Sequence, residues 1–180
     1  MKTPVQLIKG TGEIVLASIC PMNEKHLEDI QNLWQGMLAE AEQVDDGWAW
    51  EYKLRQSQQS DRHEAYVVEE ENLTHGLIYI ETQWHRSQFP HRKPLVYIET
   101  INSAPWNRIE IEDPPYLKGV GKALLLFSRQ RSLKIGFGGR VGLHALPGTE
   151  RFYRRQQMPE YEPDAEKEGL IYFEYGTLRQ

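Results

Sequence analysis

The sequence predicts an α/β (α+β) chain in which about seven β-rich runs alternate with about four helical runs. Three observations support this class. Short apolar runs end at turns rich in Gly, Pro and Asn, and longer runs repeat apolar residues at helical spacing. The chain has 180 residues, of which 39% are hydrophobic, and contains neither an internal repeat nor a low-complexity linker. We therefore expect one domain over residues 1–180.

The N-terminal half begins with a strand pair and a helix. Val5 to Ile8 and Glu13 to Ile19 are β-rich and flank the turn Gly10-Thr-Gly12, which predicts a hairpin. Asn23 is a suitable N-cap for a helix that runs to Ala41. The apolar residues of this helix share one face: Leu27, Ile30, Trp34, Met37, Leu38 and Ala41.

A second helix begins in the segment from Asp45 to Tyr52 and reaches about Gln58. Its aromatic residues, Trp48, Trp50 and Tyr52, are interpreted first as core anchors, and contact with a substrate is the alternative. The remaining elements follow in order, as strands Glu64 to Val68, Leu73 to Thr82 and Leu95 to Ser103, helix Gly119 to Leu133, strand Arg140 to Leu146, helix Thr149 to Gln156 and strand Leu170 to Tyr175.

A glycine-spaced turn opens the helix at Gly119. Lys118-Gly119-Val120-Gly121 lies where bare helical N–H groups can bind a phosphate. The spacing excludes a Walker loop, because Tyr116 and Ala123 stand where Gly and Ser or Thr are needed. It also excludes the dinucleotide fingerprint, because Leu124 stands where a third Gly is needed. Neither ATP nor NAD is favoured.

This turn resembles the pyrophosphate motif of the GNAT superfamily of N-acetyltransferases, and three further segments follow in that family's order. They are Tyr97-Ile-Glu-Thr-Ile-Asn-Ser-Ala-Pro105, Arg140-Val-Gly-Leu-His-Ala-Leu146 and Glu150-Arg-Phe-Tyr-Arg-Arg155. The chain departs from the family at Tyr116 (usually Gln or Arg) and at Gln157 (often Gly), and its turn from Pro105 to Gly119 is long. The resemblance implies a mixed, mostly antiparallel central sheet.

The resemblance also implies acetyl-CoA as co-substrate and a set of site residues. Tyr153 matches the family's Tyr near the CoA sulfur and is the expected general acid. A Tyr next to Phe152 on an amphipathic helix could equally be a core residue. Lys118 and Lys122 are equally compatible with solvated charges. The expected cofactor-binding residues are Ile101, Asn102, Ser103, Lys118, Gly119, Val120, Gly121 and Lys122.

Glu99 is the candidate general base. Strand alternation places it on one face with Leu95, Tyr97, Ile101 and Ser103, so we expect apolar neighbours to raise its pKa. The alternative is a structural Glu that reaches the sheet edge or pairs with an arginine.

His144 is interpreted first as a hydrogen-bonded strand residue, and a proton-relay role is left open. The loop from Ala104 to Pro115 is either a rigid surface excursion or a flap, in which case Trp106 and Arg108 would contact the ligands. We interpret the scattered histidines as solvated turn residues, and no metal site is expected around them: His63, His75, His85 and His91.

Charge and composition limit the partners. The net charge of −5 with interleaved signs argues against nucleic acid, and Cys20, the one cysteine, excludes an intrachain disulfide. No apolar run has the length of a signal or membrane segment, so we expect a cytoplasmic protein.

The expected function is acetyl transfer from acetyl-CoA directly to a primary amine of a small molecule or peptide. The scaffold also allows a homodimer, and the sequence does not name the acceptor. The alternative is a non-catalytic acyl-CoA sensor or partner-binding module on the same scaffold.

Overall fold

Alternating apolar residues start the chain as an antiparallel hairpin in the computed structural model, which describes residues 2–43, 45, 47–88 and 92–178. Strands β1 (Thr3–Lys9) and β2 (Ile14–Pro21) pair in register, Thr3 opposite Ile19 and Ile8 opposite Ile14. The other strands are β3 (His63–Glu70), β4 (Leu73–Glu81), β5 (Val96–Ser103), β6 (Leu117–Lys118), β7 (Val141–Ala145), β8 (Glu160–Asp164) and β9 (Leu170–Tyr175).

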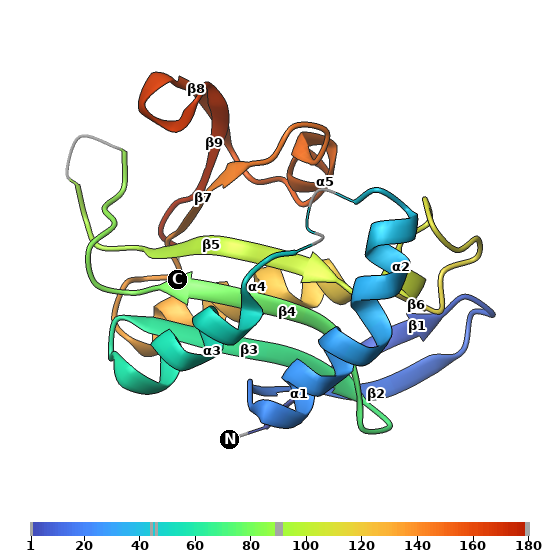
Figure 1. Ribbon diagram of the computed structural model, residues 1–180. Coiled ribbons are helices and arrows are strands. Elements are labelled where there is room, and N and C mark those ends of the chain that lie inside the picture. Colours follow the sequence, from blue (N-terminus) through green and yellow to red (C-terminus); the bar gives the residue numbers. More distant parts are fainter. Residues whose placement is uncertain (1, 44, 46, 89–91, 179–180) are drawn as a thin grey trace. The chain divides into compact units, whose positions relative to one another are not determined.

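The described residues contain a nine-stranded sheet in the order β6-β1-β2-β3-β4-β5-β7-β9-β8 (Figure 1). Pairing is mostly antiparallel, with β5 and β7 parallel. The mixed, mostly antiparallel prediction is therefore confirmed, but the expected count of seven strands is wrong. β6 has only two residues, and β8 is Glu160-Tyr-Glu-Pro-Asp164, whose acidic residues and proline hide any apolar alternation.

The chain divides into two compact units. The first unit consists of Met1–Tyr79 and Thr100–Leu124, and the second unit consists of Ile80–Glu99 and Leu125–Gln180. The single domain over 1–180 stays a prediction. The helices are α1 (Glu24–Asp29), α2 (Gln35–Glu40), α3 (Trp50–Gln59), α4 (Val120–Lys134) and α5 (Glu150–Arg155), with short turns η1 (Ile30–Trp34), η2 (Pro105–Asn107) and η3 (Ala165–Lys167). Within the described ranges, no helix combines the length and the apolar character that crossing a membrane requires.

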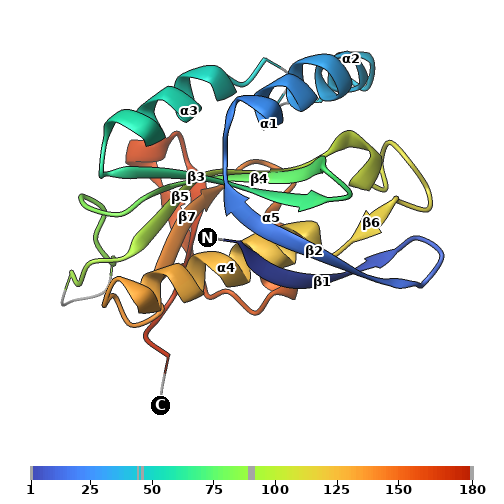
Figure 2. The same ribbon diagram turned by 90° about the horizontal axis from the view of Figure 1, so that it is seen from below.

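In the first unit, α1, η1 and α2 form the first predicted helix, interrupted by a π turn at η1. Asn23 caps it as predicted, because its side chain accepts the Lys25 N–H at 3.1 Å. Together with α3 these helices lie along one face of the strands, and α4 begins on the opposite face (Figure 2). The core between helices and strands is built around Trp34, Trp50 and Leu54.

Gly76 on β4 sets how closely α4 approaches the strands of the first unit. A Cβ at this position would lie 2.4 Å from Val120 Cγ1 and 3.2 Å from Leu124 Cδ1. Contacts below 3.0 Å do not occur between real side chains, so only glycine permits this approach.

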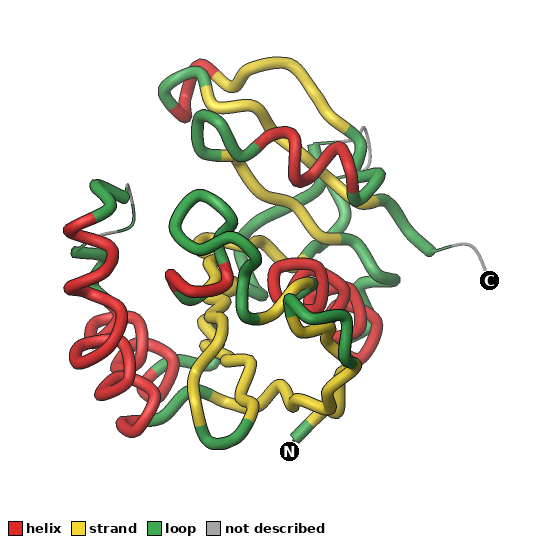
Figure 3. The backbone as a smooth tube through the Cα atoms, turned by 90° about the vertical axis from the view of Figure 1, so that its right-hand side faces the viewer, coloured by secondary structure: helices red, strands yellow, loops and turns green. Residues whose placement is uncertain are grey.

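In the second unit, α5 lies on the connection between β7 and β8 (Figure 3). Two buried glutamates fix the segment that follows β4. Glu81 accepts the N–H groups of Gln83, Trp84 and His85 at 2.6, 2.7 and 3.0 Å. Glu174 accepts the Ser87 hydroxyl at 2.6 Å. Because both carboxylates are buried with hydrogen-bond donors, their role is structural.

Candidate functional site

The predicted phosphate turn lies in the first unit, where β6 leads through Gly119 into α4. Gly119 has φ +93°, a left-handed conformation that glycine adopts without strain. Leu117 and Val120 on either side are buried and anchor the turn, while Lys118 and Lys122 are exposed. The first N–H groups of α4 lack intrahelical partners, so the turn offers donors and two nearby cations to an anion.

The end of β5 adjoins this turn. A Cβ built on Gly76 would lie 3.3 Å from the carbonyl oxygen of Asn102 at the end of β5. The same Cβ would lie 2.4 Å from Val120 Cγ1 at the start of α4, so both segments meet at Gly76. The structure therefore brings together two groups of predicted cofactor-binding residues that are distant in sequence. Ile101, Asn102 and Ser103 are each partly buried.

A largely buried ion pair holds the end of β5. Arg108 donates to Asp45 from both terminal nitrogens, 2.8 Å for Nη1 to Oδ1, and its Nε donates to the Ser103 carbonyl at 2.9 Å. Asn102 Nδ2 also donates to Asp45, at 2.9 Å. Burial acts to raise the pKa of Asp45, but the hydrogen bonds from Arg108 and Asn102 outweigh it and hold that pKa below its usual value.

The sequence interpretation missed this ion pair. Asp45 and Arg108 are 63 residues apart and no local pattern joins them. Arg108 was expected to contact ligands if its loop were a flap, but its guanidinium is bound within the protein. The pair ties the segment between α2 and α3 to the loop after β5.

The rest of the loop from Ala104 to Pro115 is anchored at His75. This anchoring supports the interpretation as a rigid surface loop rather than a flap. The Ala104 N–H donates to the His75 carbonyl at 2.9 Å, and Trp106 Nε1 donates to His75 Nδ1 at 3.2 Å. Asn107 accepts the Leu117 N–H at 2.8 Å, which closes the loop onto β6. Tyr116 stacks on His75 with ring centroids 5.5 Å apart. The loop is therefore a fixed support for the phosphate turn.

The prediction that the histidines lie in solvated turns is wrong for His75. It is fully buried on β4, and burial lowers its pKa to about 4. His63 lies at the start of β3 and is partly buried, and His85 is fixed by Glu81 at 2.7 Å. His91 lies outside the described residues.

In the second unit, the expectation that Glu99 has a buried, apolar environment is wrong, because its side chain is exposed. Its neighbours along the strand are apolar, but nothing in that alternation fixes whether another element covers this part of β5. The role of Glu99 as base stays a prediction.

Tyr153 is buried on α5, with 6% of its surface exposed, and packs against Phe152 and Phe173. Burial raises the pKa of its phenol, which keeps the group protonated and also makes it a weaker acid, and its packing suits a core residue as well. The structure does not test the expected position of Tyr153 near a sulfur atom.

His144 on β7 is hydrogen-bonded at both ring nitrogens, which confirms its interpretation as a hydrogen-bonded strand residue. Nδ1 lies 2.7 Å from the Tyr97 hydroxyl, and Nε2 lies 2.9 Å from Asp164 Oδ2. Tyr97 is also stacked on His85, with ring centroids 3.8 Å apart.

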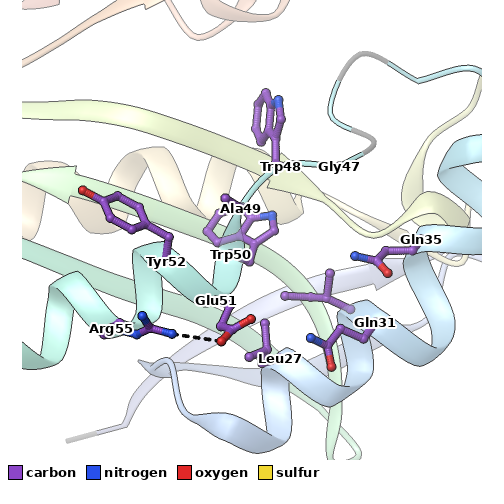
Figure 4. A pocket seen from close by; sticks show the side chains of 11 residues that line it. Leu27, Gln31, Gln35, Gly47, Trp48, Ala49, Trp50, Glu51, Tyr52 and Arg55 are labelled. Atoms are coloured by element: carbon purple, nitrogen blue, oxygen red, sulfur yellow. Dashed lines mark hydrogen bonds and ion pairs between the residues drawn. The ribbon is translucent and has the colours of Figure 1, made fainter.

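A pocket of about 330 Å³ lies in the first unit between the α1–η1 helix and α3 (Figure 4). Trp48 and Tyr52 line it together with the amides of Gln31 and Gln35. Trp50 is buried in the core as first interpreted, whereas Trp48 is partly and Tyr52 largely exposed. Trp48 also packs against the core, in agreement with the first interpretation. Contact with a substrate remains the alternative for the exposed parts of Trp48 and Tyr52.

Among the described residues, Cys20, His26 and Glu69 have potential ligand atoms within 4.8 Å of one another. These groups already have other partners. His26 Nδ1 accepts the Asn23 N–H at 3.0 Å, which assigns the ring proton to Nε2, the atom that would bind a metal. Glu69 also pairs with Lys2 at 2.7 Å. The cluster is best explained as part of the helix cap and ion-pair network.

No family model matches the sequence, and no curated protein matches it. Solved structures do match. The GNAT domain of S. lividans PAT has a TM-score of 0.60 at 10% identity over 96% of each chain. Bacillus subtilis N-acetyltransferase YlbP, in complex with coenzyme A, has a TM-score of 0.57 at 12% identity over 97% of this chain and 96% of that one.

The aminoglycoside N-acetyltransferase AAC(6')-Iy, in complex with CoA, has a TM-score of 0.53 at 18% identity over 77% of this chain and 87% of that one. At such identities the similarity establishes the fold. The chain has the GNAT acetyltransferase fold, which confirms the resemblance at that level.

Proposed function

We propose that this chain, which has the GNAT acetyltransferase fold, transfers an acetyl group from acetyl-CoA directly to a primary amine. The observation that carries the proposal is the phosphate turn in the first unit. There a left-handed Gly119 opens α4 beside the end of β5, and Gly76 lets them approach. This arrangement suits the pyrophosphate of a CoA ester, because backbone donors and exposed lysines surround the helix start.

The donor would be bound by the eight residues predicted for it, all of which lie in the first unit. The N–H groups of Gly119, Val120, Gly121 and Lys122 would bind the pyrophosphate. The segment from Ile101 to Ser103 would bind the arm that carries the thioester, and one of its N–H groups would stabilise the oxyanion.

The proposed base is Glu99 and the proposed acid is Tyr153. An exposed carboxylate at Glu99 attracts an ammonium acceptor and can accept its proton, after which the free amine attacks the thioester carbon. The tetrahedral intermediate collapses by breaking the C–S bond. Tyr153, protonated in the folded protein, would give its proton to the departing CoA thiolate, and its phenolate would regain a proton from the second N–H of the attacking nitrogen. The proton held by Glu99 would be the one released to solvent.

The acceptor would be a small molecule or a peptide. The pocket beside Trp48 and Tyr52 offers aromatic faces and side-chain amides to such a ligand, and its volume of about 330 Å³ is at the lower end of the range for small-molecule sites. One similar structure is named an aminoglycoside acetyltransferase, and another is the AtaT toxin bound to an antitoxin C-terminus. We propose a cytoplasmic protein, where acetyl-CoA is available.

The test is CoA release from acetyl-CoA, followed with a thiol reagent across a panel of primary amines and with water as the basal acceptor. We expect Glu99→Gln and Tyr153→Phe to lower kcat roughly 10–100-fold, because each removes a proton-transfer group. The Kd for acetyl-CoA should change less than about twofold. Unchanged kcat in both variants would reject the catalytic assignment, and tight binding without any CoA release would favour the non-catalytic sensor.

A further inference from the structure

The phosphate turn is preceded by a strand that is too short to hold it. β6 consists of Leu117 and Lys118 alone, and it pairs with β1 at Ile8 and Lys9. Two residue pairs give little support to a turn that must keep its N–H groups aimed at a charged ligand. The position of the turn therefore depends on how the loop before β6 is anchored, and several of those anchors meet at His75.

His75 holds this loop by its backbone and by its ring. Its carbonyl oxygen accepts the Ala104 N–H at 2.9 Å and an Nδ2–H of Asn107 at 3.1 Å. Its ring Nδ1 accepts the Trp106 indole N–H at 3.2 Å and also lies 3.2 Å from Asn107 Nδ2. The Tyr116 ring stacks on the imidazole, with an angle of 12° between the ring planes. The start and the end of the loop are thus fixed to one residue of β4.

The chemistry of the partners sets the protonation state in which His75 can hold the loop. An indole N–H can only donate, so Nδ1 must accept, and the proton of the neutral ring must lie on Nε2. Nε2 faces Glu70, whose Oε2 lies 3.6 Å away and favours a proton at that nitrogen. His75 is fully buried and burial lowers its pKa to about 4, so the ring is neutral at pH 7.

Asn107 connects this anchor to the phosphate turn. Its Oδ1 accepts the Leu117 N–H at 2.8 Å, which places Nδ2 on the side of His75 and agrees with the role of the ring as acceptor. Leu117 is 1% exposed and lies two residues before Gly119. A continuous set of contacts therefore leads to the phosphate turn from β4, a strand with a neighbour on each side in the sheet.

We infer that His75 is the positioning residue of the phosphate turn, because through Trp106 and Asn107 it holds the N–H groups of the turn where a CoA pyrophosphate would bind. The inference rests on the proposed function. It assigns to His75 a part in donor binding and none in proton transfer. The pyrophosphate is remote from the thioester, so its contacts are the same in the ground state and in the transition state. Loss of the anchor should therefore raise the KM for acetyl-CoA and leave kcat unchanged.

The first test separates the acceptor nitrogen of His75 from its ring. His75→Phe keeps a ring for Tyr116 to stack on but leaves the Trp106 indole N–H without an acceptor. His75→Asn loses the ring and keeps an acceptor oxygen close to the place of Nδ1. We expect the calorimetric Kd for acetyl-CoA to rise roughly 5–50-fold in His75→Phe and less than about threefold in His75→Asn. Tighter binding by His75→Phe than by His75→Asn would overturn the inference.

His26→Phe is the matched control. His26 is also a buried histidine of the first unit, with 1% of its surface exposed, but its ring nitrogens contact Asn23 and Glu69 instead of the loop. The substitution should lower stability and leave the Kd within about twofold of the wild type, since the site is independent of the turn. All titrations are made well below the thermal midpoint of the least stable variant. An equal loss of affinity in His26→Phe would show that general destabilisation weakens binding, and would overturn the inference.

A double-mutant cycle tests the connection through Asn107. Asn107→Leu removes the contacts with His75 and Leu117 in a partly buried loop, so it also serves as the test if His75→Phe does not fold. We expect the same rise in Kd as for His75→Phe. The two losses should not add in the double variant, because each single variant already breaks the same connection. Wild-type affinity in Asn107→Leu, or additive losses, would overturn the inference.

Kinetics in the CoA-release assay distinguish positioning of the donor from a role in the reaction itself. The KM for acetyl-CoA should rise with Kd in His75→Phe while kcat stays within about twofold of the wild type, the reverse of the pattern expected for Glu99→Gln. A fall in kcat without a change in KM would overturn the inference. Wild-type affinity in His75→Phe together with weak binding by Gly119→Ala would reject the positioning role and leave the proposed donor site intact. Failure of the wild type to bind acetyl-CoA would reject both.

Discussion

The buried carboxylate of Glu81 shows how a single residue can control a whole segment. Three consecutive N–H groups and the ring of His85 point at it. Burial acts to raise its pKa, but these hydrogen bonds outweigh it and lower the pKa to about 2. The charged form is therefore the one that the folded protein stabilises.

This predicts a specific pH dependence of stability. The folded pKa lies below the ordinary value of 4.5, so the stabilisation is complete above about pH 4.5 and is lost as pH falls toward 2. Glu81→Gln should lower the free energy of unfolding by roughly 2–4 kcal/mol at pH 7, because an amide cannot accept all these bonds. Urea titrations at pH 7 and pH 3 would measure this.

The difference between wild type and Glu81→Gln should narrow at pH 3, where wild-type Glu81 begins to lose its charge. Glu162→Gln on the surface serves as the control and should change stability little at either pH. A difference that stayed constant with pH would contradict the assigned role of the charge.

The sequence pattern predicted the environment of some residues correctly and that of others wrongly. Alternation along β5 placed Glu99 correctly on one face of its strand, but exposure depends on what covers that face, which alternation does not encode. His75 looked like a turn residue, yet it is buried because Trp106 and Asn107, far along the chain, approach it. The Asp45–Arg108 pair is likewise a product of tertiary structure.

At the scale of elements, the contact at Gly76 sets how β4, β5 and α4 meet. Gly76→Ala should destabilise the protein by roughly 1–3 kcal/mol, because the new methyl group would lie 2.4 Å from Val120 Cγ1. Val120→Ala should partly relieve this, so the double variant should be more stable than the sum of the single effects predicts. Thermal or urea unfolding of the four proteins measures the coupling.

Gly36→Ala is the matched control for this experiment. Gly36 is exposed on α2 and a Cβ there meets nothing within 4 Å, so alanine should stabilise the helix slightly. Additive effects of Gly76→Ala and Val120→Ala would show that the close approach at Gly76 does not position α4.

Elements were predictable where their periodicity was strong. The four expected helices and seven expected strands are all present, because apolar spacing and turn residues mark them locally. β6 escaped prediction because two residues carry no period, and it exists only by pairing with β1. β8 escaped because it is a short, charged strand that carries a proline and pairs with β9.

For the whole molecule, the fold could be predicted from the sequence more directly than the function. The order of a strand, a glycine-opened helix, a second strand and a Phe-Tyr helix was enough to indicate the GNAT fold, and solved structures at 10–18% identity confirm it. The donor and acceptor are harder to predict, because a fold supports many chemistries and the site depends on particular side chains.

The most direct test of the proposed function is calorimetric titration with acetyl-CoA, using ATP and NAD as controls, on the wild type, Gly119→Ala and Gly12→Ala. Both glycines have φ +93°, so the two substitutions impose similar backbone strain, but only Gly119 lies at the phosphate turn. We predict that wild type and Gly12→Ala bind acetyl-CoA alone and that Gly119→Ala loses at least tenfold in affinity. Failure of the wild type to bind acetyl-CoA, or equal binding by all three proteins, would contradict the account.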